Sequence, residues 1–268
     1  MGVTMGSERS PRGHGAGDPT RGVPDGDAAG VARRAALTQL AHPFGRLFWV
    51  AVAAVIASLV RIAYFTPIEA SQGPAQKIFY VHVPAAVTAL YLAFALMAVA
   101  SVLYLWLRDP TLDRVAASSA EVGLAFTTVV LLTGPLWAKP VWGTWWSGDA
   151  RLTSTLFLWL IILGYLILRQ AVEDRAQRAR YSAVLAILAG LLIPFIHLSV
   201  YLFRTLHPQP IVLKPSAPSL PSEMLTTLVM SFASFALLFV ALLRARYRLA
   251  TIADADLADV ATRSGGAD

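Results

Sequence analysis

The chain contains no cysteine among its 268 residues. This absence excludes disulfide bonds, thiolate metal sites and thiol catalysis within the chain itself. The sequence also lacks a phosphate-binding glycine loop, an HExxH zinc motif, a Ser, His and Asp spacing that would support a triad, and any internal repeat. Since no nucleophile or acid and base pair is assembled, the sequence favours a binding and transfer protein over a conventional enzyme.

Charged residues are scarce, at 14% of the chain against 56% hydrophobic residues, and the mean hydropathy is +0.60. Soluble domains usually carry more charge, so these values indicate an integral membrane protein. Six apolar runs of 17 to 25 residues approach the roughly 20 residues that cross a bilayer. They predict an all-α, polytopic bundle of six transmembrane helices, because backbone groups in lipid must be satisfied within each segment. The runs are 47–65, 83–107, 122–138, 152–168, 181–203 and 225–243.

The positions of the 22 Lys and Arg residues predict the orientation of this bundle. Sixteen lie in the termini and in the loops after the second and fourth runs, and six lie on the opposite side. By the positive-inside rule, both termini are cytoplasmic and the other loops are external. The same distribution explains the net charge of +6 without a nucleic-acid partner. We therefore expect a multi-pass protein of the cell (plasma or inner) membrane, with the lipid bilayer as its surroundings.

Three segments follow from these patterns. Residues 1–45 are rich in Gly, Arg, Asp and Ser and lack the apolar core of a signal peptide, so they are expected to be a disordered cytoplasmic tail. Residues 46–248 form the six-helix transmembrane domain. Residues 249–268 form a cytoplasmic C-terminal tail that begins as a short helix.

The external segment 139–151 is the most unusual part of the chain. Trp142, Trp145 and Trp146 lie within five positions, and Asp149 follows them. Tryptophans at a membrane surface often form an anchoring belt, but a belt distributes its rings over several helix ends. This concentration predicts a flat aromatic platform that suits a large planar ligand. Asp149 also stands where a carboxylate caps the next helix, and the two roles can coexist.

Two histidines are expected beside this platform. His82 lies where the chain enters the second helix, with Pro84 in the first turn, and His207 follows the fifth helix. His197 competes with His207 as a functional residue because it lies inside the fifth helix, although ten residues of helix put it about 15 Å deeper. We expect its neutral ring to bond a carbonyl freed by Pro194.

Two neutral imidazoles beside an aromatic platform match the requirements of an iron porphyrin. Histidine nitrogen is a good axial ligand for haem iron, and tryptophan rings can cover the porphyrin. The anionic propionates need cations, for which Lys139, Arg151 and Arg204 are candidates. The predicted site comprises His82 and His207 as iron ligands, together with Trp142, Trp145, Trp146, Asp149 and Arg151.

Three motifs resemble the CcmC family, which belongs to the tryptophan-rich WWD superfamily of haem-handling membrane proteins. They are KIFYVHVP at 77–84, WGTWWSGDARLTS at 142–154 and HLSVYLFRTLH at 197–207. The resemblance implies that haem b is bound transiently at the external face, with His82 and His207 as axial ligands. It also implies delivery to the haem chaperone CcmE during cytochrome c maturation, beside the ABC-type subunits CcmA and CcmB and the small helper CcmD.

Two places depart from the family pattern. The position before the acid, an aromatic residue in the family, is Gly148, which predicts a thinner wall of the platform. The segment before the second histidine is usually aromatic and carries an Asn, whereas this chain has Leu202, Phe203 and Arg204.

Three other functions fit parts of the sequence. A transporter or permease subunit would move haem or a small molecule through the bundle, but transporters place polar groups at mid-membrane, where these spans carry little charge. A purely structural subunit would need no pair of external histidines. A cytochrome c synthetase-type relative would attach haem to thiols of another protein, and it is usually larger than this chain.

Overall fold

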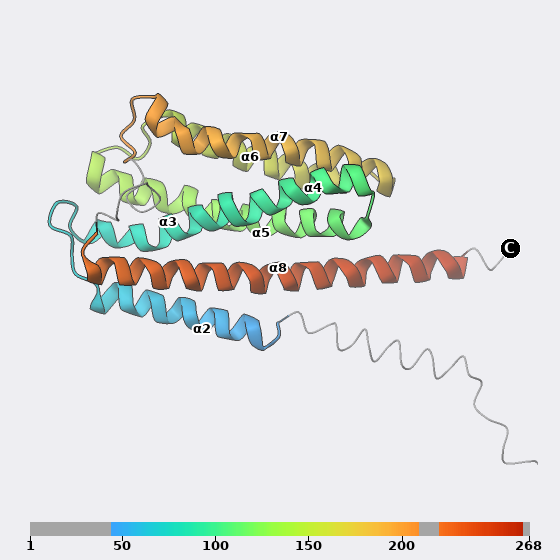
Figure 1. The fold of residues 1–268 in the computed structure, drawn as a ribbon, viewed down its shortest axis with the longest axis horizontal. Helices are drawn as coiled ribbons and strands as arrows, with labels where there is room; N and C mark the ends of the chain where they lie inside the picture. Colours follow the sequence, from blue (N-terminus) through green and yellow to red (C-terminus); the bar gives the residue numbers. More distant parts are fainter. Residues whose placement is uncertain (1–43, 209–219, 265–268) are drawn as a thin grey trace, which may run out of the picture. The chain divides into compact units, whose positions relative to one another are not determined.

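The computed structural model describes residues 44–208 and 220–264. Six helices in these ranges are long and apolar enough to cross a membrane, which confirms the predicted all-α class (Figure 1). The predicted tail of residues 1–45 lies outside the described ranges except for its last two residues. The helical spans are Arg46–Phe65 (α2 and a π turn), Pro74–Leu107, α5 Pro110–Trp142, α6 Ala150–Ala171, α7 Arg175–Leu202 and α8 Ser222–Ser264.

Consecutive helical spans run in opposite directions. The second span is made of η2 Pro74–Ile78, α3 Phe79–Val87, η3 Thr88–Phe94 and α4 Ala95–Leu107. Its α4 part packs against α5 and α7, α6 packs on α7, and α2 lies along α8 (Figure 1). The ends of α2, α5 and α7 meet the starts of η2, α6 and α8 at one end of the bundle. We call it the histidine end, because His82 and His207 lie there.

The second helix begins earlier than the apolar pattern indicates. It is helical from Pro74, so His82 lies well inside the span and Pro84 is an interior residue, not a first-turn one as predicted. The pattern missed this start because the first turn is polar. Pro74 begins it at the position where a missing N–H is harmless.

Two other helices also exceed their apolar runs. α5 continues through Pro135 and Pro140 to Trp142, which shortens the tryptophan loop to residues 143–149. α8 continues to Ser264, past the boundary at residue 248 where the sequence suggests a tail. A hydropathy pattern detects only the apolar part of a helix, whereas these extensions carry more polar residues.

Helix α2, the first span, has α8, the last, as its main neighbour. Ser58 Oγ donates to Ser234 Oγ at 3.1 Å, and Arg61 Nε donates to Thr227 Oγ1 at 3.1 Å. Hydrogen bonds between helices help to hold a bundle in lipid, where apolar burial drives association only weakly. Ser58 of α2 and Arg61 of the following π turn thus have hydrogen-bond partners on α8.

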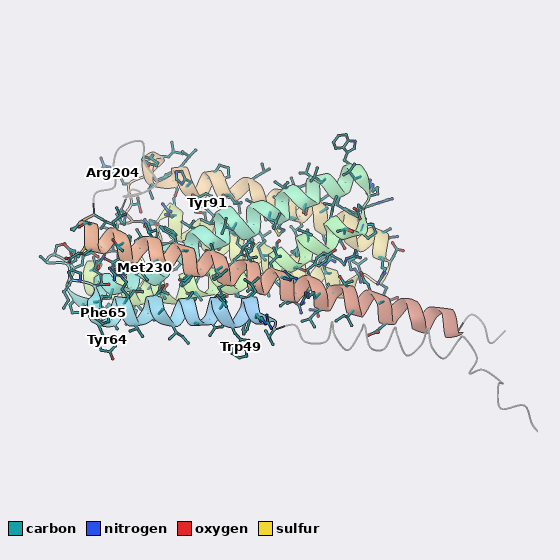
Figure 2. All side chains as sticks on the ribbon, turned by 60° about the horizontal axis from the view of Figure 1, so that its bottom comes forward. Trp49, Tyr64, Phe65, Tyr91, Arg204 and Met230 are labelled. Atoms are coloured by element: carbon teal, nitrogen blue, oxygen red, sulfur yellow. The ribbon has the colours of Figure 1, made fainter. Side chains whose placement is uncertain are left out.

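Aromatic side chains project outward from both ends of the first span. Trp49 lies near the start of α2, and Tyr64 and Phe65 lie at its end; all three are exposed in the bundle (Figure 2). Such rings favour the boundary between lipid and water. Their positions are those expected of rings at the two surfaces of a membrane.

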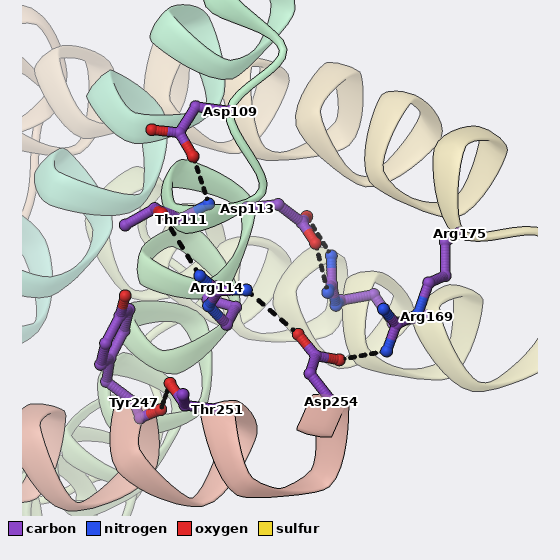
Figure 3. Close-up of polar contacts among 9 residues, drawn as sticks. All are labelled: Asp109, Thr111, Asp113, Arg114, Arg169, Arg175, Tyr247, Thr251 and Asp254. Atoms are coloured by element: carbon purple, nitrogen blue, oxygen red, sulfur yellow. Dashed lines mark hydrogen bonds and ion pairs between the residues drawn. The ribbon is translucent and has the colours of Figure 1, made fainter. Parts of the chain in front are cut away.

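The end of the bundle opposite the histidine end carries a network of ion pairs. Arg169 of α6 donates two hydrogen bonds to the Asp113 carboxylate of α5, at 2.6 and 2.9 Å. Asp254, in the extension of α8, accepts from Arg114 of α5 and from Arg175 of α7 (Figure 3). The extension of α8 is therefore tied to the bundle by charge, although it is too polar to lie within lipid.

Close contact between α4 and α7 depends on a glycine. A Cβ added at Gly190 would stand 2.7 Å from the Cβ of Ala98, whereas nothing lies within 4 Å of a Cβ added at Gly164. We expect Gly190→Ala to separate the two helices and to lower the free energy of unfolding by about 1–3 kcal/mol. Gly164→Ala is the matched control and should be neutral or slightly stabilising. Thermal unfolding in detergent measures both variants, and equal melting temperatures would contradict this packing.

Candidate functional site

A cavity of about 320 Å³ opens between the helices at the histidine end. Its wall includes His82 from α3, His197 from α7 and His207 from the segment after α7. The structure thus brings both predicted iron ligands, His82 and His207, to one cavity. The same cavity also contains His197, the alternative to His207. The predicted depth of His197 does not exclude it, because the cavity reaches inward along the helices. No group of three or more His, Asp or Glu residues in the described ranges is arranged to hold a bare metal ion.

His82 is held in one tautomer by its neighbour on α5. Its Nδ1 lies 2.9 Å from Oγ1 of Thr133, and that hydroxyl donates its only proton to the carbonyl of Val129 at 2.7 Å. The hydroxyl oxygen must therefore accept from Nδ1–H of His82, which leaves Nε2 with its lone pair. Trp137 packs edge-on against the ring, with centroids 5.8 Å apart, and Gly134 leaves room beside it. This arrangement orients a buried imidazole with Nε2 as an available ligand.

His207 has the same tautomer for a different reason. Its Nδ1 lies 3.0 Å from the carbonyl oxygen of Pro208, which can only accept, so Nδ1 carries the proton. Burial and the nearby charge of Arg151 together lower the pKa of His207 to about 4, against the smaller opposing effects of the hydrogen bond to Pro208 and the charge of Asp149. The ring is therefore neutral at neutral pH, with the Nε2 lone pair free. Trp142 lies beside it, with ring centroids 6.4 Å apart.

Asp149 links the tryptophan loop to the segment that carries His207. One carboxylate oxygen accepts from the backbone N–H of Leu152 at 3.0 Å, which caps α6 as the sequence suggests. The other accepts from the hydroxyl of Thr205 at 2.6 Å, and Thr205 Oγ1 in turn accepts from the N–H of His207 at 3.0 Å. Burial raises the pKa of Asp149, but these hydrogen bonds outweigh it and the pKa lies below its ordinary value. The ionised carboxylate therefore positions His207.

The three loop tryptophans have different surroundings. Trp146 lines the cavity and is 37% exposed. Trp145 is 55% exposed and is not part of the cavity wall, and Trp142 ends α5 beside His207. Gly148 has a φ of +68°, a left-handed conformation that favours glycine. The departure at this position therefore has a backbone reason: an aromatic residue here would be strained in this loop.

Of the three candidate cations, only Arg151 contributes to the cavity wall. Its Nη1 is buried and has no hydrogen-bond partner among the described residues. Lys139 instead donates to the carbonyl of Gly143 at 3.0 Å, and Arg204 is exposed after the end of α7 (Figure 2). A buried guanidinium nitrogen without a partner favours an anionic ligand in the cavity.

Among the described residues, His197 is not hydrogen-bonded to a backbone carbonyl, so the expectation from the sequence was wrong. Its Nδ1 lies 2.6 Å from the hydroxyl of Tyr91 in η3. The partner is therefore a side chain of η3, which packs against α7, and not a carbonyl of α7 itself.

Sequence reasoning missed several residues of the site. The i, i+4 spacing of Thr133 and Trp137 puts both on one face of α5, and this spacing is a signal that the sequence does carry. Tyr91 carries no comparable signal. Its position depends on how the second span folds.

Comparisons with known proteins agree with the motifs of the site. The family model of Heme exporter protein C (CcmC) matches residues 29–260. Heme exporter protein C of Bradyrhizobium diazoefficiens is 38% identical over 218 residues, which cover 81% of each chain. That of Rhodobacter capsulatus is 35% identical over 209 residues, 76% of this chain and 86% of its own. A ccmC-like mitochondrial protein of cytochrome c biosynthesis from Marchantia polymorpha is 39% identical over 173 residues, 64% of this chain and 72% of its own.

Proposed function

We propose that this chain, which belongs to the family of heme exporter protein C, binds haem in the cavity at its histidine end and delivers it to a haem chaperone. The members of this family are multi-pass membrane proteins that handle haem for cytochrome c maturation. Haem is the cargo and not a resident cofactor, and the chain acts as a binding and transfer protein. The predicted orientation puts this cavity on the extracytoplasmic side.

The observation that carries this proposal is the hydrogen bond that each of the two histidines makes through Nδ1. His82 and His207 both use Nδ1–H to donate a hydrogen bond, to Thr133 Oγ1 and to the carbonyl of Pro208. Histidines that bind metals commonly donate the second ring N–H in this way, which orients the ring and makes the ligating nitrogen more basic. Each histidine therefore presents Nε2 as an axial ligand for haem iron.

The remaining wall fits the rest of the porphyrin. Trp146 offers an aromatic face beside the histidines, and Arg151 offers a buried cation for a propionate. Trp142 supports His207, and Asp149 fixes the segment on which His207 lies. The exposed Trp145 is left as a surface over which the chaperone CcmE can approach the edge of the haem.

Transfer requires that one imidazole leaves the iron, and the two histidines differ in how firmly they are held. His82 is 7% exposed, lies within a helix and is bonded to α5. His207 follows the end of α7 and is held through Thr205 and Asp149. We therefore assign His207 as the ligand that is displaced. The ABC-type subunits CcmA and CcmB and the helper CcmD are the partners expected to drive release.

The proposal is tested by following haem from one protein to the other. The full chain is purified in detergent, loaded with haem b and mixed with haem-free CcmE, and the visible spectrum of each protein is recorded after separation. We expect haem to leave the chain and to appear on CcmE. Failure of the chain to bind haem, or haem that stays on it in the presence of CcmE, CcmA, CcmB and CcmD, would contradict delivery.

The two neighbouring tryptophans provide a matched pair of variants. Trp146→Ala removes a ring from the cavity wall and should lower the haem content about tenfold, since an aromatic contact with the porphyrin is lost. Trp145→Ala removes an exposed ring and should leave the haem content unchanged while slowing transfer to CcmE. Haem content per chain and the rate of transfer are the two measurements. The same loss of haem in both variants would mean that the loop binds haem as a single platform.

A further inference from the structure

Tyr91 and His197 form a polar pair in the part of the cavity that lies within the bundle. The Tyr91 hydroxyl is 2.6 Å from Nδ1 of His197, and the two rings meet edge-on with centroids 6.0 Å apart. Both side chains line the same cavity as His82 and His207. Tyr91 lies farther along the bundle than Arg204, which marks the histidine end (Figure 2). The iron ligands assigned above leave this pair without a role.

The pair offers one hydrogen-bond donor to a ligand in either of its protonation patterns. If the hydroxyl of Tyr91 donates to Nδ1, the neutral ring of His197 carries its proton on Nε2. If Nδ1–H donates to the phenol oxygen, the hydroxyl of Tyr91 keeps its own proton for another acceptor. Both patterns favour a ligand atom that accepts hydrogen bonds.

Arg151 belongs to the same region of the cavity. The ionisable groups that act on its charge are Tyr91, Asp149 and Tyr201, and Tyr201 also packs on His197 with ring centroids 6.3 Å apart. The Nη1 atom of Arg151 is buried and has no hydrogen-bond partner among the residues that the structure describes. A donor pair beside an unpaired guanidinium matches the chemistry of a carboxylate.

We propose that Tyr91, His197 and Arg151 form a carboxylate subsite that receives a propionate of the bound haem. This inference rests on the proposed haem-binding function and adds the orientation of the bound porphyrin. The propionate edge of the porphyrin lies inward, toward η3 and α7, and the opposite edge lies toward the exposed Trp145. His197 is then a ligand of the carboxylate and not of the iron.

The subsite is tested with two porphyrins that differ only in their carboxylates. The purified full chain is titrated with iron protoporphyrin IX and with its dimethyl ester, and binding is followed by the Soret band. We expect the wild type to bind the free acid about a hundredfold more tightly than the ester. Tyr91→Phe and His197→Leu should each reduce this preference about tenfold, since a hydrogen bond to a charged group is lost. Their Soret maxima should stay at the position of the wild type.

Tyr181→Phe is the matched control, because Tyr181 lies on the same helix α7 as His197 but is exposed and is not part of the cavity wall. Its preference for the free acid should equal that of the wild type. Equal binding of acid and ester by the wild type would overturn the subsite while leaving the proposed function intact. A Soret shift in His197→Leu would overturn it too, since it would make His197 an iron ligand. If the wild type binds neither porphyrin, the proposed function itself fails.

Discussion

Replacement of His82 or His207 by alanine is expected to reduce the haem that copurifies with the chain by about tenfold or more. Each side chain supplies an Nε2 atom to the cavity, and each is oriented by a hydrogen bond from Nδ1. Loss of one axial ligand leaves the iron five-coordinate, so the remaining haem should change from a low-spin to a high-spin spectrum. Visible absorption spectra of the purified variants, normalised to protein, measure both the amount and the spin state.

Added imidazole separates loss of a ligand from loss of the fold. A small imidazole can occupy the space left by the missing side chain, and it should restore the low-spin spectrum of both variants. His197→Ala should keep the low-spin spectrum without added imidazole. If His197→Ala loses this spectrum while His207→Ala retains it, the second ligand is His197 and our assignment is wrong.

Replacement of Asp149 by alanine is expected to have the second large effect. The carboxylate caps α6 through Leu152 and holds Thr205, which lies two residues before His207. Loss of a helix cap costs about 1 kcal/mol, and release of the segment that carries His207 should lower haem content about tenfold. Thermal unfolding and haem content of the same preparation measure the two effects.

Two further variants separate positioning from direct contact with haem. Asp149→Asn keeps an acceptor for Leu152 and should preserve the melting temperature, because asparagine is also a good helix cap. Thr205→Val removes the hydroxyl that receives the bond from His207 and donates to Asp149, so it should lower haem content without loss of the cap. If Asp149→Asn loses haem completely and Thr205→Val retains it, the carboxylate acts on haem directly.

The number of spans could be predicted from the sequence, but the helix boundaries could not. A run of apolar residues is sufficient to identify a segment that lies in lipid. The helix extensions lie outside lipid and depend on particular contacts. One example is Asp254 in the extension of α8, which pairs with Arg114 of α5 and Arg175 of α7. These ion pairs join residues far apart in the sequence. A pattern of hydropathy does not contain them.

The site was predictable only where residues are close in sequence or stand at a helix end. The tryptophan loop, the cap at Asp149 and His207 belong to this class. Tyr91 does not, because it follows His82 by nine residues, and at about 100° per residue an α-helix would turn it to the opposite face. The π segment Thr88–Phe94 turns less per residue, and both side chains line one cavity. The periodicity of a regular α-helix therefore does not place Tyr91 in the same cavity as His82.

The pairing of the first helix with the last bears on how the chain is made. Ser58 of α2 and its partner Ser234 of α8 are 176 residues apart, which takes roughly 9–35 s at a synthesis rate of about 5–20 residues per second. During this interval, Ser58 and Arg61 are in the membrane before the helix that satisfies them exists. Helix α8 is therefore the last part of the bundle to assemble. A chain that stops before residue 222 would leave its first helix without its main neighbour, open to quality-control proteases of the membrane.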